Sequence, residues 1–399
     1  MRILIAAAGS RGDVAPYTGL GAGLREAGHD VTLATTDAFA PLVREAGLEF
    51  RSLPSRPQAR HEVEGRRALM RTATAFVTEL GQGFADAVDE RTDLLLLSTT
   101  TAPLGRHVAE AMGIPAIGAY LQPTAPTGDF PPVVMGTRSL GRLGNRAAGR
   151  FALRMADRVY TEAVSALRRR LDLPALAPSE IRRRQERAHE PVLHGFSTAL
   201  VPRPSDWRTG LDVVGTWWPY VAPERRLPAE VEDFLAAGAR PVFVGFGSMA
   251  AGHGERLSEL TVQALRRGGL RGIVQAGSAG LAGDGDDVLT IGDVPHALLF
   301  PRVAAVVQHA GAGTTAAALR AGVPTVAVPV TADQPFWAGR LAAIGAATDP
   351  IPFASLTAER LADALGRAVR QQAYTRAASV AARHMATEDG VGAVLQALG

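Results

Sequence analysis

The residues best suited to chemistry lie in one stretch of the C-terminal half, HAGAGTT, which follows a short apolar run. Gly311 and Gly313 have no side chains, so a ligand can approach the backbone closely there. Thr314 and Thr315 suit a helix N-cap, where free amides present partial positive charge to an anion. His309 can donate a hydrogen bond to the same anion. The pattern predicts a metal-free cradle for a diphosphate, and the alternative is a plain tight strand-to-helix connection.

A carboxylate and an amide follow the next apolar run, at Asp333 and Gln334. Such a pair can accept a hydrogen bond from one sugar hydroxyl and donate to another. A solvent-exposed loop is the alternative. If the preceding runs are parallel strands, this pair and the predicted cradle lie at the same edge of one sheet.

The elements that must position these residues alternate between strands and helices, which indicates parallel, doubly wound sheets. Each expected strand is a short apolar run followed by a glycine or polar turn. The expected strands are Arg2–Ala8, Asp30–Thr35, Asp93–Ser98, Pro115–Tyr120, Val242–Phe246, Ile273–Ala276, Val288–Ile291, Val303–Val307 and Thr325–Val328. The expected helices include Tyr17–Ala27, Leu104–Met112, Glu255–Arg267 and Thr314–Ala321.

This alternation of strands and helices occurs twice along the chain, so we expect an α/β protein with two Rossmann-like domains facing across a cleft. The expected boundaries are 1–205 for an N-terminal domain, 206–226 for a proline-rich linker, 227–376 for a C-terminal domain and 377–399 for a helical tail. Ligands of such sheets usually bind at the carboxyl ends of the strands. The C-terminal half would then bind the charged ligand, and the N-terminal half a second substrate.

Composition excludes several classes of function. The chain has 399 residues, 47% of them hydrophobic, a net charge of +3 and no cysteine, so disulfides and thiol chemistry are excluded. All 42 basic residues are arginine. Arg168–Arg170 and Arg182–Arg184 fall in helical stretches, where neighbours spread around the axis, so we expect a solvated face and no nucleic-acid partner. The start of the chain favours a first strand over a signal peptide, which predicts a cytoplasmic protein without membrane insertion.

Four motifs resemble the inverting nucleotide-sugar-dependent glycosyltransferases of GT-B type. They are GSRGDVAP (Gly9–Pro16), VGFGSM (Val244–Met249), GDVPHALLFPRVAAVVQHAGAGTT (Gly292–Thr315) and GVPTVAVPVTADQPFWAGRL (Gly322–Leu341). Their order and spacing are similar to sterol glucosyltransferases and to enzymes that glycosylate glycopeptide, macrolide and related antibiotics. The resemblance extends over nearly the whole chain.

The resemblance implies roles for the donor site. It implies that the diphosphate is held by His309, Gly311, Gly313 and Thr314, with Ser248 contributing from the facing turn. It implies that the backbone of Val294, together with His296, holds the nucleobase, and that Asp333 and Gln334 hold the transferred sugar. This chain departs from the family pattern at Gln308, Ala310 and Asp293, where relatives often have histidine, glycine and a stacking tryptophan.

The catalytic base is implied by the first glycine-rich turn. Many relatives carry a histidine there, whereas this chain has Ser10, Arg11, Gly12 and Asp13. The subgroup that it resembles has an aspartate at the position of Asp13, which is therefore assigned as general base. Ser10, Arg11 and Gly12 are assigned to the donor site, and Arg11 has two open roles, contact with the diphosphate or pairing with Asp13. The alternative for Asp13 is an N-cap of the following helix.

Other functions fit the sequence less well. Asp284–Asp287 contains an Asp-x-Asp pattern of the type that holds a metal, but its Gly/Asp-rich context favours a surface turn, so neither a metal nor a cofactor is expected. The opening GSRG does not match the dinucleotide motif G-x-G-x-x-G, which argues against an NAD-dependent oxidoreductase. A nucleotide-sugar epimerase and a non-catalytic auxiliary protein of the same fold remain as alternatives.

The acceptor is expected in the N-terminal half, lined by aromatic residues. The candidates are Phe76, Phe84, Tyr120 and Phe130, although helix packing explains them equally well. By family analogy the acceptor is a small apolar aglycone of polyketide, macrolide or sterol-like type, and the donor a UDP- or dTDP-sugar. Formation of a homodimer is left open.

Overall fold

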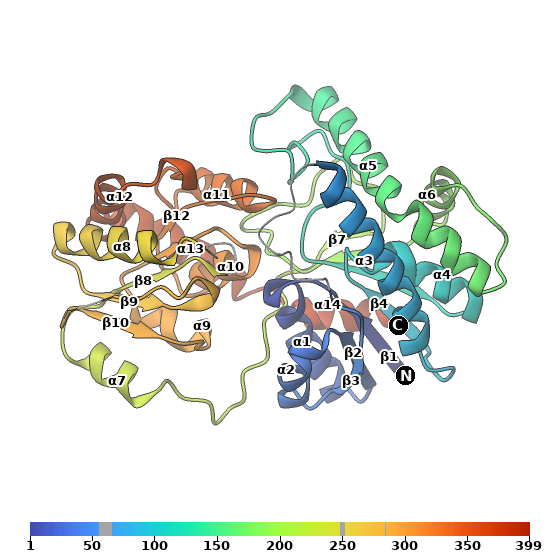
Figure 1. Ribbon diagram of the computed structural model, residues 1–399, viewed down its shortest axis with the longest axis horizontal. Helices are drawn as coiled ribbons and strands as arrows, with labels where there is room; N and C mark the ends of the chain where they lie inside the picture. The colour runs from blue at the N-terminus through green and yellow to red at the C-terminus, as the bar shows by residue number, and fades with distance from the viewer. Residues whose placement is uncertain (56–65, 248–251, 284) are drawn as a thin grey trace.

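The computed structural model describes residues 1–55, 66–247, 252–283 and 285–399. Two α/β domains lie side by side, with the N-terminal half of the chain in one and most of the C-terminal half in the other (Figure 1). Both sheets are entirely parallel, as the alternating pattern predicts.

The N-terminal sheet has seven strands in the order β3-β2-β1-β4-β5-β6-β7. They span Arg2–Ala6 (β1), Asp30–Thr35 (β2), Glu49–Ser52 (β3), Leu94–Leu97 (β4), Ala116–Tyr120 (β5), Val192–His194 (β6) and Leu211–Val213 (β7). Strand β4 is four leucines, all buried, because a central parallel strand has helices on both of its faces. The helices of this domain are α1 (Arg11–Glu26), α2 (Ala40–Glu45), α3 (Arg66–Ala87), α4 (Ala102–Met112), α5 (Gly141–Arg170) and α6 (Pro178–Arg187).

The C-terminal sheet has five strands in the order β10-β9-β8-β11-β12. They span Val242–Gly245 (β8), Gly272–Gln275 (β9), Val288–Ile291 (β10), Ala305–Gln308 (β11) and Thr325–Ala327 (β12). The helices are α7 (Ala229–Ala236), α8 (Gly254–Gly268), α9 (His296–Leu299), α10 (Ala312–Arg320), α11 (Gln334–Ala343), α12 (Ala358–Arg370), α13 (Gln372–Met385) and α14 (Gly390–Leu398).

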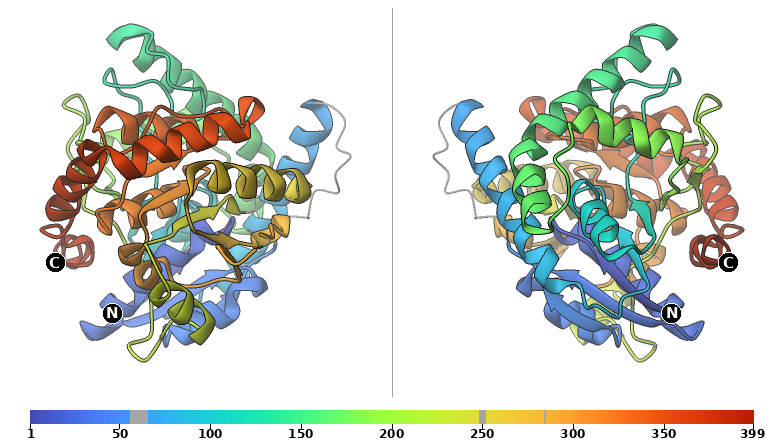
Figure 2. Two further views of the ribbon diagram at one scale, coloured as in Figure 1. Left: turned by 90° about the vertical axis from the view of Figure 1, so that its left-hand side faces the viewer. Right: turned by 90° about the vertical axis from the view of Figure 1, so that its right-hand side faces the viewer.

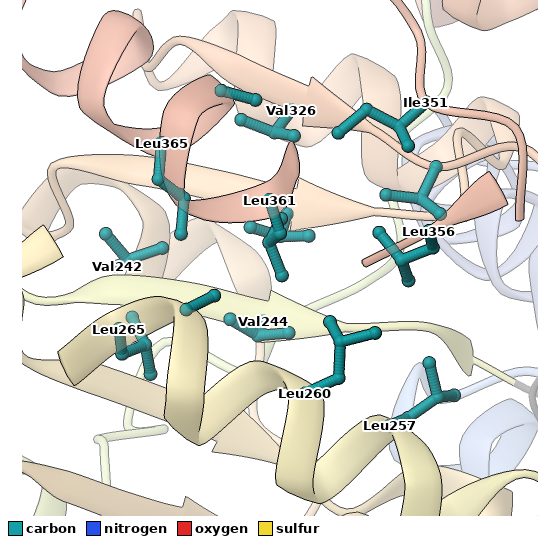
Figure 3. Close-up of a cluster of buried hydrophobic side chains, with 14 of the residues drawn as sticks. Val242, Val244, Leu257, Leu260, Leu265, Val326, Ile351, Leu356, Leu361 and Leu365 are labelled. Atoms are coloured by element: carbon teal, nitrogen blue, oxygen red, sulfur yellow. The ribbon is translucent and has the colours of Figure 1, made fainter. Parts of the chain in front are cut away.

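One face of this sheet packs against α8 and α12. Figure 3 shows Val242 of β8 beside Leu265 of α8, with Val244 further along the same strand and Leu361 and Leu365 of α12 above this layer. All five side chains are fully buried. Burying one such side chain contributes about 1.5–3 kcal/mol, so this layer holds the sheet rigid behind the strand ends.

The last two helices connect the domains. Helix α13 packs against α10 of the C-terminal domain, and α14 packs against α1 of the N-terminal domain. Trp217 Nε1 donates a hydrogen bond of 3.0 Å to the carbonyl of Gly390, which joins the interdomain segment to the start of α14. The end of the chain therefore crosses back over the domain junction.

The structure differs from the expected elements at three short strands. Strands β3, β6 and β7 were not predicted, because three or four residues carry too little periodicity to be recognised. Strand β7 pairs with β6 and so belongs to the N-terminal sheet, although it falls within 206–226, the range predicted to be linker. The prediction failed there because the surrounding prolines obscured a strand at the sheet edge.

Both sheets reverse their strand order at one strand pair, β1/β4 and β8/β11. In open parallel sheets this point leaves a crevice at the carboxyl ends of the strands. Helix α1 follows β1, α10 follows β11, and the first turns of the two helices meet. A small cavity of about 30 Å³ between the domains is lined by Gly12 and Pro16 of α1 and by Ala312 and Gly313 of α10, among others.

Candidate active site between the domains

The N-terminus of α10 faces the cleft. Gly311 is the N-cap and the helix starts at Ala312, so the amides of residues 312–314 open the helix without intrahelical partners. The predicted N-cap at Thr314 and Thr315 is wrong, since Thr314 is the third helical residue and the Thr315 amide already donates to the Gly311 carbonyl at 2.9 Å. A glycine N-cap leaves the positive end of the helix open to an anion.

The ring of His309 lies between two glycines beside this helix start. A Cβ added to Gly247 would lie 2.9 Å from its Cε1, and one added to Gly311 would lie 2.6 Å from its Nε2. Burial lowers the pKa of His309 to about 4, so the imidazole is neutral at pH 7. Its Nδ1 is buried and, within the described part of the chain, has no hydrogen-bond partner. The helix start and a neutral imidazole therefore lie together, as the predicted cradle requires.

The start of α1 lies on the opposite side of the cleft. Ser10 is the N-cap and Asp13 the third helical residue, and Oδ2 of Asp13 accepts hydrogen bonds from the Ser10 amide (2.7 Å) and Ser10 Oγ (2.8 Å). This capping box begins the helix at Arg11, six residues before the predicted start at Tyr17. Gly9 has a φ of +149°, and a Cβ there would lie 2.5 Å from Asp13 Oδ2, so the glycine makes room for the carboxylate.

Arg11 reaches across the cleft to the C-terminal domain. Its Nη1 lies 3.8 Å from Oδ2 of Asp293, whose Oδ1 accepts a 2.9 Å bond from Gln275 Nε2. Both charged side chains are more than half exposed, so the pair contributes little to stability. The structure thus gives Arg11 a partner other than Asp13, and it brings the start of α1 to the residues predicted to hold the nucleobase.

Those predicted base-binding residues lie at the start of α9. The His296 ring stacks on Phe300 with centroids 4.3 Å apart and meets Phe243 edge-on at 5.6 Å. Burial, and then the nearby charge of Arg11, lowers the pKa of His296 to about 4. Val294 is buried two residues earlier. The ring is therefore neutral and fixed by packing, while the backbone around it stays at the cleft.

Asp333 joins the two domains directly. Its Oδ2 accepts hydrogen bonds from Trp337 Nε1 (2.7 Å) in its own helix region and from Gln122 Nε2 (2.8 Å), which follows β5 of the N-terminal sheet. Burial raises the pKa of Asp333, and the negative charge of Asp13 raises it further. Asp13 is therefore one of the charges that act on Asp333.

Gln334 is buried and closes the loop before α11. Its Oε1 accepts bonds from the amides of Val330 (2.8 Å) and Thr331 (3.1 Å). The acceptor half of this amide is therefore occupied by backbone, and only its NH₂ group is left for a ligand. The alternative of a solvent-exposed loop does not hold for this residue, which is 5% exposed.

A cavity of about 390 Å³ lies in the N-terminal domain beneath α5. Two of the four predicted acceptor residues, Tyr120 and Phe130, line it. Phe76 and Phe84 lie instead in the hydrophobic core with β4 and α4, so they do not face the cavity. The sequence pattern could not separate the two pairs, because core packing and cavity lining select the same residue types.

The remaining predictions concern residues that the structure does not describe, a metal site and a membrane-spanning helix. Ser248 and the first residue of Asp284–Asp287 lie outside the described residues. Among the residues that are described, no cluster of three or more His, Asp or Glu side chains is arranged to hold a metal ion. No described helix combines the length and the apolar character needed to span a bilayer.

Three site residues were not predicted from the sequence. Gln122 and Trp337 bind Asp333, and Gly247 makes room for His309. Gln122 had a usable signal, because it comes two residues after a predicted strand, and a polar residue there lies at the carboxyl edge of its sheet. Nothing in the local pattern indicates that Gln122 meets Asp333, 211 positions away in the chain.

Comparison with protein families and known proteins agrees with this arrangement. Residues 3–127 match the glycosyltransferase family 28 N-terminal domain, and residues 275–398 match the erythromycin biosynthesis protein CIII-like C-terminal domain. The O-mycaminosyltylonolide 6-deoxyallosyltransferase of Streptomyces fradiae is 36% identical over 98% of this chain and 95% of its own length. A sterol 3-beta-glucosyltransferase of Arabidopsis thaliana is 33% identical over the whole of this chain, which spans 65% of that protein.

Solved structures share the fold. The glycotransferase of kitacinnamycin has a TM-score of 0.75 at 22% identity, covering 100% of this chain and 97% of that one. The SsfS6 glycosyltransferase of Streptomyces sp. SF2575, complexed with thymidine diphosphate, has a TM-score of 0.65 at 22% identity, covering 99% of each chain. With two parallel-sheet domains and relatives aligned along almost its full length, the chain belongs to the glycosyltransferases of GT-B fold, with a family 28 N-terminal domain and an erythromycin CIII-like C-terminal domain.

Proposed function

We propose that the enzyme transfers a hexose or deoxyhexose, with inversion, from a UDP- or dTDP-sugar to a hydroxyl of a small apolar aglycone. The observation that carries the proposal is the meeting of two groups in one cleft. The open N-terminus of α10 with neutral His309 lies on one side, and the carboxylate of Asp13 on the other. The first side suits a departing diphosphate, and the second suits a hydroxyl that must lose its proton.

The donor roles follow from the charges and hydrogen-bonding groups. The amides that open α10 and the imidazole of His309 would hold the diphosphate and stabilise the negative charge that develops as it leaves. The backbone at Val294 and the ring of His296 would hold the base. Asp333 and the NH₂ group of Gln334 would hold the sugar hydroxyls.

Asp13 is the proposed general base. As the acceptor oxygen forms its bond to the anomeric carbon, its proton passes to the Asp13 carboxylate, and the bond to the diphosphate breaks on the opposite face. The topology supports this role, because Asp13 follows β1 and Asp333 follows β12, which places both carboxylates at the carboxyl ends of parallel strands. One face of the sugar would then meet the base and the other the α10 cradle.

The acceptor site is proposed in the cavity beneath α5. A volume of about 390 Å³ is within the range of sites that enclose drug-sized ligands. The lining combines Tyr120 and Phe130 with polar side chains such as Gln122, which suits an apolar aglycone with a few hydroxyls. The named activities of the macrolide and sterol relatives support a polyketide, macrolide or sterol-like acceptor, and the thymidine diphosphate in SsfS6 supports a dTDP-sugar as one donor class.

The proposal is tested first by metal-free thermal shift with UDP, dTDP and NAD. A ligand at about 100 times its dissociation constant adds roughly 2.7 kcal/mol of stability. We expect UDP or dTDP to raise the melting temperature and NAD to leave it unchanged. With an acceptor present, NMR of the product should show an anomeric configuration opposite to that of the donor. Retention, or isomerisation of the sugar nucleotide without an acceptor, would refute the proposal.

Two further expectations belong to this function, and one question of assembly goes with them. We expect turnover to persist in a chelator, since helix amides can take the charge that a metal would neutralise. We expect the enzyme to work in the cytoplasm, where sugar nucleotides are available. A homodimer stays open, and sedimentation of the purified chain would decide it.

A further inference from the structure

Exposed apolar side chains gather on α5 and on the loop before it. Leu143 is 83% exposed and Phe151 is 54% exposed on the helix, and Val134, Met135 and Leu140 precede them in the loop and are also exposed. We call these five residues the α5 patch. Soluble proteins rarely leave so many large apolar side chains uncovered in one place, so this surface calls for a partner.

The same surface is basic. Arg150, Arg154 and Arg158 follow at intervals of four residues, which places them on the side of α5 that carries Leu143 and Phe151. Within the described part of the chain, none of the three has an ion pair with an acidic side chain. No Asp or Glu occurs from residue 130 to residue 156, and the two ion pairs that this stretch forms with described residues, Arg142 with Asp129 and Arg146 with Asp206, leave Arg150 and Arg154 uncompensated.

We propose that the α5 patch and its arginines dock on the surface of an anionic lipid bilayer. A helix with leucine and phenylalanine beside a row of arginines matches an interfacial helix, with apolar groups among the acyl chains and guanidinium groups at the phosphates. Nucleic acid would account for the arginines but would leave the five apolar side chains without a partner. The bilayer accounts for both.

The position of the helix in the fold favours the same partner. In Figures 1 and 2 the first turns of α5 project above the rest of the N-terminal domain, on the side toward the C-terminal domain. Leu143 in the first turn is 83% exposed, so a flat surface can reach this end of the helix.

Docking there would also bring the acceptor cavity to the membrane. The opposite side of α5 lines that cavity through Gly149 and Leu153, and Val134 belongs both to the exposed patch and to the cavity lining. This consequence rests on the proposed function: an apolar aglycone dissolved in the bilayer would enter beneath α5 without crossing water. The docking itself does not depend on which sugar is transferred.

The test is co-sedimentation of the full chain with vesicles. We expect binding to vesicles of equimolar phosphatidylglycerol and phosphatidylcholine, and weak binding to phosphatidylcholine alone. The charge variant Arg150→Gln/Arg154→Gln/Arg158→Gln should lower the partition coefficient on the order of 100-fold, and Leu143→Ser/Phe151→Ser should lower it at least tenfold. A matched control, Arg367→Gln/Arg376→Gln/Arg383→Gln, removes three exposed arginines from the C-terminal domain and should leave binding within about twofold.

A reporter variant shows whether the helix itself enters the interface. Phe151→Trp should shift its fluorescence to the blue with anionic vesicles and be quenched by brominated acyl chains. Failure of the wild type to sediment with the vesicles would overturn the proposal, since the exposed surface would then be a contact for another protein. Equal losses of binding in the charge variant and the control would overturn it too, since binding would then depend only on the overall charge of the protein. Turnover with a water-soluble acceptor reports separately on the glycosyltransferase reaction, and the patch variants should retain it.

Discussion

Replacing Asp13 by Asn separates the two roles that the structure gives this residue. Asparagine keeps the volume but cannot take a proton, so loss of a general base should lower kcat by about 10²- to 10⁴-fold, or roughly 3–5 kcal/mol of activation free energy. The same residue caps α1 through two hydrogen bonds from Ser10. Losing part of that cap, together with the negative charge near the helix start, should cost about 0.5–2 kcal/mol of folding stability.

Ser10→Ala is the matched control. It removes the 2.8 Å bond from Ser10 Oγ but keeps the backbone amide that binds the Asp13 carboxylate at 2.7 Å. We expect a similar loss of folding stability, about 0.5–2 kcal/mol, but a kcat within about tenfold of wild type.

Both variants should be compared at saturating donor and acceptor, with unfolding in denaturant measured in parallel. Saturating substrate matters because Ser10 is also a proposed donor ligand. Turnover of Asp13→Asn near the wild-type rate with folding intact would refute the assignment. Equal losses of turnover in the two variants would also refute it, since the cap alone would then explain the effect.

Three further predictions concern the domain contact and the buried polar groups. Gln122→Ala removes a charge-assisted bond between the domains, from Gln122 to Asp333, of about 1.5–3 kcal/mol, so the observed arrangement of the two domains should become at least tenfold less populated. Energy transfer between fluorescent labels on Glu45→Cys and Glu259→Cys measures the separation of the two domains. The labelling is specific because the chain has no other cysteine, and an energy transfer that Gln122→Ala leaves unchanged would count against the prediction. Because burial raises the pKa of Asp333, its charged form costs folding free energy above that pKa. The wild type should therefore gain stability relative to Asp333→Asn as the pH falls through the raised pKa, and a difference that does not vary with pH would contradict the reasoning. Gln308 is fully buried, and neither of its side-chain amide atoms has a hydrogen-bond partner within the described structure. Gln308→Met should therefore raise the free energy of unfolding by about 1–3 kcal/mol. Unchanged or lower stability of this variant in denaturant would contradict the prediction.

The sequence by itself determined the fold class and the composition of the donor side. Strands such as Asp30–Thr35 and Val288–Ile291 were predicted with their observed boundaries, because short runs rich in Val, Ile and Thr between turn signals indicate strands. The strand-to-helix connection at His309–Thr314 follows from its glycines in the same way. These features depend on neighbours in the chain, so a local pattern is enough to predict them.

Only the tertiary structure decided which distant groups meet. Gln122 on Asp333, Arg11 opposite Asp293 and α14 on α1 each join segments that are far apart in the chain. It also decided that Phe84 is core while Phe130 lines the cavity, since both are aromatic residues in helical or irregular surroundings. The physical reason is that burial and pairing depend on how the two domains pack. The packing energy is a sum over contacts between residues that are distant in the chain, and the spacing of neighbouring residues does not predict such contacts.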